Sequence, residues 1–90
     1  MAKIKFTSAL KRFFPSLSET EIEGRSVKEV LYNIEKIYPG ISSYLMDDNG
    51  VLRKHVNIFV QGDLIKDRNT LNDLVNHNDE LLVFQALSGG

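Results

Sequence analysis

The sequence predicts an α+β domain in which one amphipathic helix crosses one face of a mixed sheet of four or five strands. Three observations predict this class: alternating apolar residues near both ends, a single apolar stripe of helical period between them, and a length of 90 residues. A chain of this length can bury one hydrophobic core. We therefore expect one domain over residues 1–86 and a flexible C-terminal tail over residues 87–90.

The first strand is expected where Ala2, Ile4 and Phe6 alternate with polar residues, because that period belongs to a strand with one buried face. An apolar cluster closed by Pro15 then predicts a turn or short helical loop over residues 8–15.

A polar edge strand is expected over residues 17–23, where glutamates and serines flank Ile22. Charges on an edge strand discourage its pairing with other chains.

The helix is expected to begin at Ser26, because Ser26 and Glu29 have the spacing of a capping box. Pro39 disfavours the helical conformation of the residue before it and ends the helix. A further short helical turn is expected over residues 41–46. The apolar stripe of the main helix comprises Val27, Val30, Leu31, Ile34, Ile37 and Tyr38.

The second half of the chain predicts three strands, over residues 56–60, 64–65 and 80–86. The first and last strands of the chain are expected to lie side by side, parallel, in the centre of the sheet. A small apolar anchor is expected under the loop between residues 66 and 77, made by Leu71, Leu74 and Val75.

Composition excludes several classes of function. The chain has no cysteine and a net charge of −1, which argues against a thiol nucleophile, a thiolate metal site and nucleic-acid binding. We expect no membrane span and no signal peptide, and hence a cytoplasmic protein. His55 and His77 are expected to be surface residues without metal, and we expect no catalytic group in the chain itself.

Three segments, "YPGISSYLMDD", "NGVLRKHVNIFVQGD" and "NDELLVFQALSGG", resemble the sulfur-carrier branch of the ubiquitin-like β-grasp proteins. This is the ThiS and MoaD type, which includes archaeal ubiquitin-like small modifiers as relatives. The resemblance implies a β-grasp fold and a chain that binds no cofactor itself. It implies a carrier or co-substrate rather than an enzyme, or the small subunit of a sulfur-transferring synthase. It also implies that an E1-like adenylating enzyme uses ATP to activate Gly90, after which sulfur converts the carboxylate to a thiocarboxylate. A sulfurtransferase or the large subunit of a synthase would be the further partner, in cofactor or amino-acid biosynthesis such as that of molybdopterin or thiamin.

The chemistry of such a tail favours glycine at Gly89 and Gly90. A C-terminal carboxyl group has a pKa of about 3.5, so at neutral pH it is an anion and a poor electrophile until it is activated. Residues without a Cβ enter a narrow channel and adopt the backbone angles that it requires. The four residues from Leu87 to Gly90 reach at most ~14 Å when extended.

Resemblance to ubiquitin-like proteins, counted back from the two glycines, places Leu82 and Phe84 on the outward face of the last strand and their neighbours in the core. Phe59 shares the outward face of the middle strand. We predict that these three residues, with Leu87 and Ser88 of the tail, bind the partner. The alternative is that the fifth strand or the loop over residues 66–77 covers them.

Three functions remain open from the sequence. The chain is a sulfur carrier, a protein modifier that is conjugated through Gly90 to lysine side chains, or a β-grasp interaction module with an inert tail. The resemblance favours the first. It does not separate the first from the second, because both begin with the same adenylation.

Overall fold

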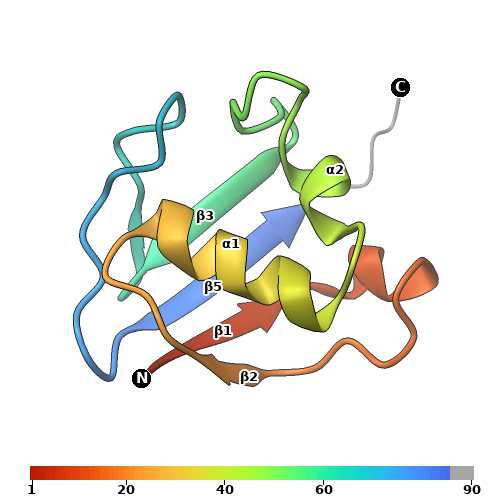
Figure 1. The fold of residues 1–90 in the computed structure, drawn as a ribbon, viewed down its shortest axis with the longest axis horizontal. Coiled ribbons are helices and arrows are strands. Elements are labelled where there is room, and N and C mark those ends of the chain that lie inside the picture. Colours follow the sequence, from red (N-terminus) through yellow and green to blue (C-terminus); the bar gives the residue numbers. More distant parts are fainter. Residues whose placement is uncertain (86–90) are drawn as a thin grey trace.

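The computed structural model describes residues 1–85. These residues form one five-stranded mixed sheet with the strand order β2-β1-β5-β3-β4, and the main helix α1 crosses one of its faces (Figure 1). The α+β class and the β-grasp arrangement predicted from the sequence are thereby observed. In chain order the elements are β1 (Ala2–Phe6), the 3₁₀ helix η1 (Ser8–Arg12), β2 (Thr20–Ile22), α1 (Val27–Ile37), α2 (Ile41–Leu45), β3 (Val56–Val60), β4 (Asp63–Leu64) and β5 (Glu80–Gln85).

The last strand, β5, lies in the centre of the sheet. It runs parallel to β1, with Phe6 beside Val83, and antiparallel to β3, with Val56 beside Gln85. The predicted parallel pairing of the first and last strands is therefore confirmed. Because β5 is hydrogen-bonded along both edges, two neighbouring strands hold its end. Parallel strands need a long crossover connection, and the residues between β1 and β5 provide it.

The core lies between α1 and the sheet. Burying a large aliphatic side chain contributes about 1.5–3 kcal/mol, so this layer supplies most of the stability. Ile37, which the predicted stripe included, is 48% exposed because the helix ends there and turns it outward. The buried residues of α1 are Val27, Val30, Leu31 and Ile34, and those facing them from the sheet include Ile4, Ile58, Leu81 and Val83.

Two polar contacts fix the ends of α1. The backbone N–H of Glu29 donates to Oγ of Ser26 over 3.1 Å, which is one of the two bonds of the predicted capping box. The reciprocal bond, from the N–H of Ser26 to the carboxylate of Glu29, is not found among the described residues. At the other end, the carboxylate of Glu35 accepts hydrogen bonds from the backbone N–H groups of Gly40 (2.7 Å) and Ser42 (2.9 Å). These bonds lower the pKa of Glu35, the bond from Gly40 most. They hold α2 against α1 at a corner where Gly40 adopts φ +97°.

Two carboxylates order the loop after β4. The carboxylate of Asp73 accepts the backbone N–H groups of Lys66 (3.0 Å) and Asp67 (2.8 Å). Asp67 accepts hydrogen bonds from the hydroxyl of Thr70 and from the backbone N–H groups of Asn69, Thr70 and Asn72. The predicted apolar anchor under this loop is correct for Leu71 and Val75, which are buried, and wrong for Leu74, which is 78% exposed.

The reason lies in the backbone pairing of this segment. The carbonyl of Asp73 accepts from Val27, and the N–H of Val75 donates to the carbonyl of Arg25. Extended backbone directs successive side chains to opposite sides, so Leu74, between them, points outward.

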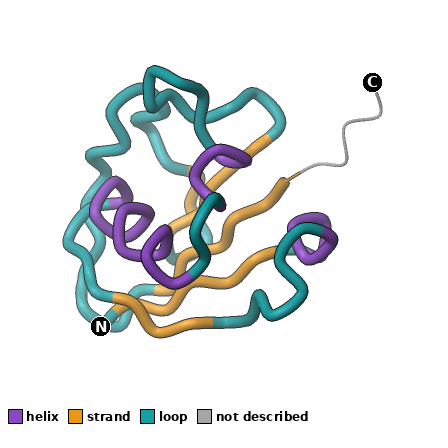
Figure 2. Tube along the Cα trace, turned by 45° about the vertical axis from the view of Figure 1, so that its right-hand side comes forward, coloured by secondary structure: helices purple, strands orange, loops and turns teal. Residues whose placement is uncertain are grey.

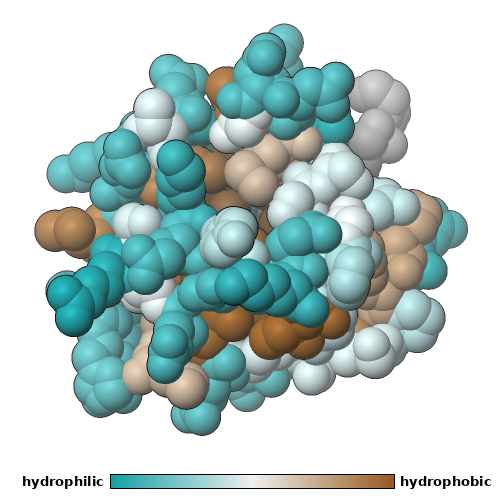
Figure 3. Space-filling view, viewed as in Figure 1, coloured by the Kyte–Doolittle hydropathy of each residue, from teal (hydrophilic) through white to brown (hydrophobic). Residues whose placement is uncertain are grey.

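The helices and the open sheet face lie on opposite sides of the molecule. In Figure 2, turned from the first view, α1 and α2 lie on one side of the strands, and η1 and α2 flank the end of β5. On the side that α1 covers, hydrophilic residues dominate the surface (Figure 3). Within the described part of the chain, no helix is long and apolar enough to cross a membrane.

Candidate partner-docking face

A row of side chains crosses four strands on the face opposite α1. Lys5 of β1 lies beside Leu82 of β5, and Leu82 lies beside Phe59 of β3. Leu64 of β4 extends the row beyond Phe59, and Phe84 projects one step further along β5. We call Phe59, Leu64, Leu82 and Phe84 the apolar face.

The apolar face is accessible to a partner. Phe84 is 42% exposed and Leu64 is 51% exposed, while Phe59 and Leu82 are half-buried. The fifth strand and the loop over residues 66–77 therefore leave Phe84 open, against the alternative that they cover it. Contiguous exposed apolar side chains of this kind mark interaction surfaces.

The predicted alternation of the last strand is confirmed by burial. Leu81 and Val83 are 1% and 0% exposed, on the opposite side from Leu82 and Phe84. Leu64 was missed by the sequence analysis. The signal that could have found it is its alternation with Ile65, which is 5% exposed and so leaves its neighbour pointing away from the core.

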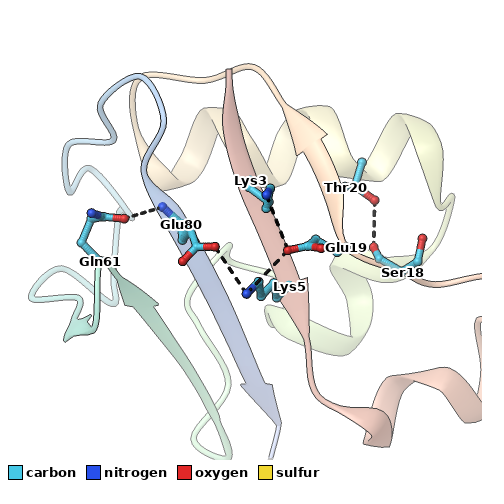
Figure 4. Close-up of polar contacts among 7 residues, drawn as sticks. All are labelled: Lys3, Lys5, Ser18, Glu19, Thr20, Gln61 and Glu80. Carbon is cyan, nitrogen blue, oxygen red and sulfur yellow. Dashed lines mark hydrogen bonds and ion pairs between the residues drawn. The ribbon is translucent and has the colours of Figure 1, made fainter.

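Charged side chains lie next to the apolar face on its β1 side, where Lys5 is beside Leu82. Figure 4 shows the contacts among these charged side chains. The ammonium of Lys5 lies 3.3 Å from the carboxylate of Glu80 and 3.6 Å from that of Glu19, which also lies 3.9 Å from Lys3. The hydrogen bond with Glu80 raises the pKa of Lys5 most, followed by the charges of Glu80 and Glu19. Ion pairs this exposed contribute little to stability, so their effect is to give the apolar face a charged margin.

A groove of about 570 Å³ lies beside this margin, where β5 begins. Lys5 and Glu80 form its charged side, and Phe59 and Leu82 form its apolar side, with Gln61 at the turn after β3. The side-chain oxygen of Gln61 accepts the N–H of Glu80 over 2.7 Å. The groove gives a partner side chain both a hydrophobic wall and polar groups.

The end of β5 is braced on both sides. The backbone N–H of Gln85 donates to Oγ1 of Thr7 over 3.3 Å, and the N–H of Thr7 donates to the carbonyl of Val83 over 3.1 Å. On the β3 side, the side-chain amide of Gln85 lies 3.2 Å from Nε2 of His55. The strand is thus fixed up to the last residue that the structure describes.

The other predicted site residues lie beyond this point. Leu87, Ser88, Gly89 and Gly90, with the end of the domain predicted at residue 86, fall outside the described residues. Within residues 1–85, no group of three His, Cys, Asp or Glu side chains could hold a metal ion.

The sequence was compared with models of protein families. The model of the ThiS family matches residues 4–90, nearly the whole chain and the two final glycines with it. The chain belongs to the ThiS family. Family membership confirms the resemblance inferred from the three segments, and the ThiS family comprises β-grasp sulfur carriers related to ubiquitin-like modifiers. Small carriers of this family are generally not catalysts themselves.

Solved structures share the fold of this ThiS-family chain. A chain in the crystal structure of the BexX/CysO complex of Amycolatopsis orientalis has a TM-score of 0.85 at 21% identity, with all of both chains covered. CysO of Mycobacterium tuberculosis has a TM-score of 0.83 at 22% identity, covering 97% of this chain and 100% of that one. SAMP1 of Haloferax volcanii has a TM-score of 0.77 at 24% identity, covering 99% and 98%. A search of curated protein sequences finds no match.

Proposed function

We propose that this ThiS-family chain is a sulfur carrier whose reactive atom is the carbonyl carbon of Gly90. An E1-like adenylating enzyme binds the chain, takes up the residues after β5 and joins the Gly90 carboxylate to AMP. Sulfur from the partner system then displaces AMP, and the resulting thiocarboxylate donates its sulfur to a product of cofactor or amino-acid biosynthesis.

The reaction needs two displacements. A carboxylate oxygen of Gly90 attacks the α-phosphorus of ATP and pyrophosphate leaves, which converts an unreactive anion into an acyl-adenylate. A sulfur nucleophile at the sulfide oxidation level, supplied by the partner system, then attacks the acyl carbon, AMP leaves, and loss of the sulfur's proton gives the thiocarboxylate. The ATP belongs to the activating partner, and this chain contributes the carboxylate and the surface by which it is held.

One observation carries the proposal. The strand that leads toward Gly90 is the central one, and it also bears Leu82 and Phe84 of the apolar face. A partner that docks on this face therefore has Gln85, the last described residue before the tail, at a fixed distance from its contact surface. Positioning a reactant in this way replaces a search through solution by a local approach.

The apolar face fits the kind of partner that the proposal requires. Its two aromatic residues, Phe59 and Phe84, flank Leu82, and aromatic side chains with apolar neighbours are typical anchors of protein interfaces. CysO of Amycolatopsis orientalis, a structural neighbour, forms a complex with BexX. That complex supports the idea that this chain acts with partner enzymes, of which we propose an E1-like enzyme and a sulfurtransferase or synthase large subunit.

A second function shares the same first step. SAMP1 of Haloferax volcanii and of Methanosarcina acetivorans, also structural neighbours, are named small archaeal modifier proteins. This supports, as the alternative, that an activated Gly90 is transferred to lysine amines of other proteins.

The proposal is tested by ATP–pyrophosphate exchange with the E1-like enzyme of the source organism. We expect exchange that depends on this chain and disappears when Gly90 is deleted, while circular dichroism shows that the shortened chain still folds. Lys36→Ala, a change on the far side of α1, is the matched control and should leave exchange unaltered. Exchange that persists without Gly90 would refute the mechanism, and exchange with neither chain would favour an interaction module with an inert tail.

A further inference from the structure

The end of the sheet at which β5 terminates carries a group of basic residues. Because β1 is parallel and β3 antiparallel to β5, the end of β1 and the start of β3 both lie beside the end of β5. The helix η1 follows β1 there, and the segment over residues 53–55 leads into β3. Both views place η1 close to this end of β5 (Figures 1 and 2). We call the following residues of this end the basic collar: Lys11, Arg12, Arg53, Lys54 and Arg68.

The charges of the basic collar are not neutralised within the described part of the chain. The ion pairs found among residues 1–85 all involve the two lysines of β1, and none involves the collar. They join Lys3 to Glu19 and Lys5 to Glu19 and Glu80.

The acidic residues nearest to the collar along the chain are Glu19, Asp47, Asp48 and Asp67, and within residues 1–85 none of them forms an ion pair with a collar side chain. Asp47 accepts the backbone N–H groups of its own turn, from Asn49 and Val51. Asp67 likewise accepts N–H groups of its own loop. Glu19, which lines a hollow with Lys11, is the carboxylate that the lysines of β1 already share. No collar side chain is therefore ion-paired within residues 1–85, and the collar cations are available to a partner.

Two collar side chains are held in place by neutral acceptors. Arg68 donates to Oδ1 of Asn57 over 3.1 Å and to the carbonyl of Arg53 over 2.6 Å. Arg53 in turn donates to the carbonyl of Ser43 over 3.0 Å. Neutral acceptors fix a guanidinium without cancelling its charge, which lowers the entropy lost on binding. Since Asn57 lies beside Phe84, the collar is continuous with the apolar face.

The opposite end of the sheet has the opposite character. Acidic residues gather where β5 begins and where β2 and β3 end, with Arg25, Lys66 and the N-terminal ammonium of Met1 as cationic groups among them. The acidic residues are Glu23, Asp63, Asp73, Asp79 and Glu80. With a net charge of only −1, the chain thus owes its polarity to the arrangement of its charges and not to their sum.

We propose that the basic collar docks against an acidic protein surface around the mouth of the channel that receives residues 86–90. This inference rests on the proposed function and adds the chemistry of the partner's rim. Opposite charges arranged in this way raise the rate of encounter and orient the chain with the end of β5 forward. A protein rim fits better than a nucleic acid, because the collar is small, adjoins an apolar face and is backed by an acidic end that repels a long polyanion.

The test compares two triple variants that change the net charge equally. The collar variant is K11E/R12E/K54E, whose side chains are all exposed and donate none of the hydrogen bonds described above; Arg53 and Arg68 stay because they hold the loops. The control variant is R25E/K28E/K36E, at the other end and on the outer side of α1. Circular dichroism and thermal melting establish that both fold.

The readout is kcat/KM for ATP–pyrophosphate exchange with the E1-like enzyme of the source organism, measured over a series of NaCl concentrations. For the unaltered chain we expect kcat/KM to fall as salt rises, because salt screens exposed charges. For the collar variant, kcat/KM at low salt should be lower by about tenfold or more and should depend little on salt, while kcat at saturation is retained. The control variant should match the unaltered chain in kcat/KM at every salt concentration.

Three results would overturn the inference and are distinguishable. If the two triple variants have equal kcat/KM and the unaltered chain shows normal exchange, the collar does not bind the partner, and the proposed function is unaffected. If the unaltered chain supports no exchange, both the proposed function and the proposed partner of the collar are wrong. Binding of a single-stranded RNA oligonucleotide at physiological salt, lost in the collar variant alone, would assign the collar to nucleic acid instead.

Discussion

The two faces of the sheet are built from similar residues and have different roles. Along β5, Leu81 and Val83 face α1 and are buried, while Leu82 and Phe84 face away and remain accessible. The difference lies in what covers each face, since α1 packs on one side, while on the other side Phe84 is 42% exposed. An apolar side chain therefore stabilises the fold on one face and is available to a partner on the other.

The largest expected effect on stability comes from a substitution on the face of the sheet that α1 covers. Ile58→Ala removes a fully buried side chain of β3, and we expect the free energy of unfolding to fall by about 2–5 kcal/mol because a cavity remains. Urea denaturation followed by circular dichroism measures the loss. Phe84→Ala is the matched control from the paired strand and should cost less than about 1 kcal/mol, as surface substitutions do. Equal losses would show that the two faces do not differ.

Binding to the partner should depend on the accessible face and not on the covered one. Phe84→Ala should weaken association with the E1-like enzyme by about 1–3 kcal/mol, because a partly exposed aromatic on the apolar face is a candidate anchor. Isothermal titration calorimetry gives the change in Kd. An affinity unchanged by Phe84→Ala would remove this residue from the interface.

A smaller effect sharpens the account of the covered face. Ser26→Ala removes the oxygen that accepts the N–H of Glu29, and we expect a loss of about 1 kcal/mol in the free energy of unfolding. Ser26→Asp should restore most of it, since aspartate also caps helices. Should Ser26→Asp be as unstable as Ser26→Ala, the hydrogen bond is not the cause.

The smallest expected effect concerns acid stability. The hydrogen bond from the hydroxyl of Thr70, followed by those from backbone N–H groups, lowers the pKa of Asp67 to about 2, against about 3.9 in an unfolded chain. Because the folded pKa is the lower one, the contribution is complete above about pH 5 and is lost as the pH falls through about 4 to 2. Glu35 acts with the same sign.

Thermal melting of Asp67→Asn from pH 7 to pH 2 tests this. The variant should melt below the unaltered chain at pH 7, and the two curves should converge toward pH 2. A constant difference at every pH would contradict the assignment to the Asp67 carboxylate.

The elements of the fold were predictable because each has a local signal. The alternation over residues 2–6 and 56–60 predicts strands, and the spacing of Ser26 and Glu29 predicts the start of the helix. Prediction from local sequence fails where the direction of a side chain depends on pairing with a distant part of the backbone. Leu74 points outward because the residues around it pair with the segment before α1, a contact that its own sequence does not reveal.

The candidate site was predictable in part for the same reason. The accessible side of β5 followed from the resemblance to ubiquitin-like proteins, while Leu64 escaped notice because β4 has only two residues. The basic collar was not predicted from the sequence. Its members come from three separate segments, and only the pairing of β1 and β3 with β5 brings them to one end.

The intact mass of the protein purified from its own cells tests the central claim most directly. We predict a species in which one oxygen is replaced by sulfur, located in the C-terminal peptide at Gly90 and absent when Gly90 is deleted. High-mass conjugates that vanish with the same deletion would assign the modifier function instead. A chain that is blocked or clipped before Gly90, or that gains sulfur without Gly90, would contradict the account.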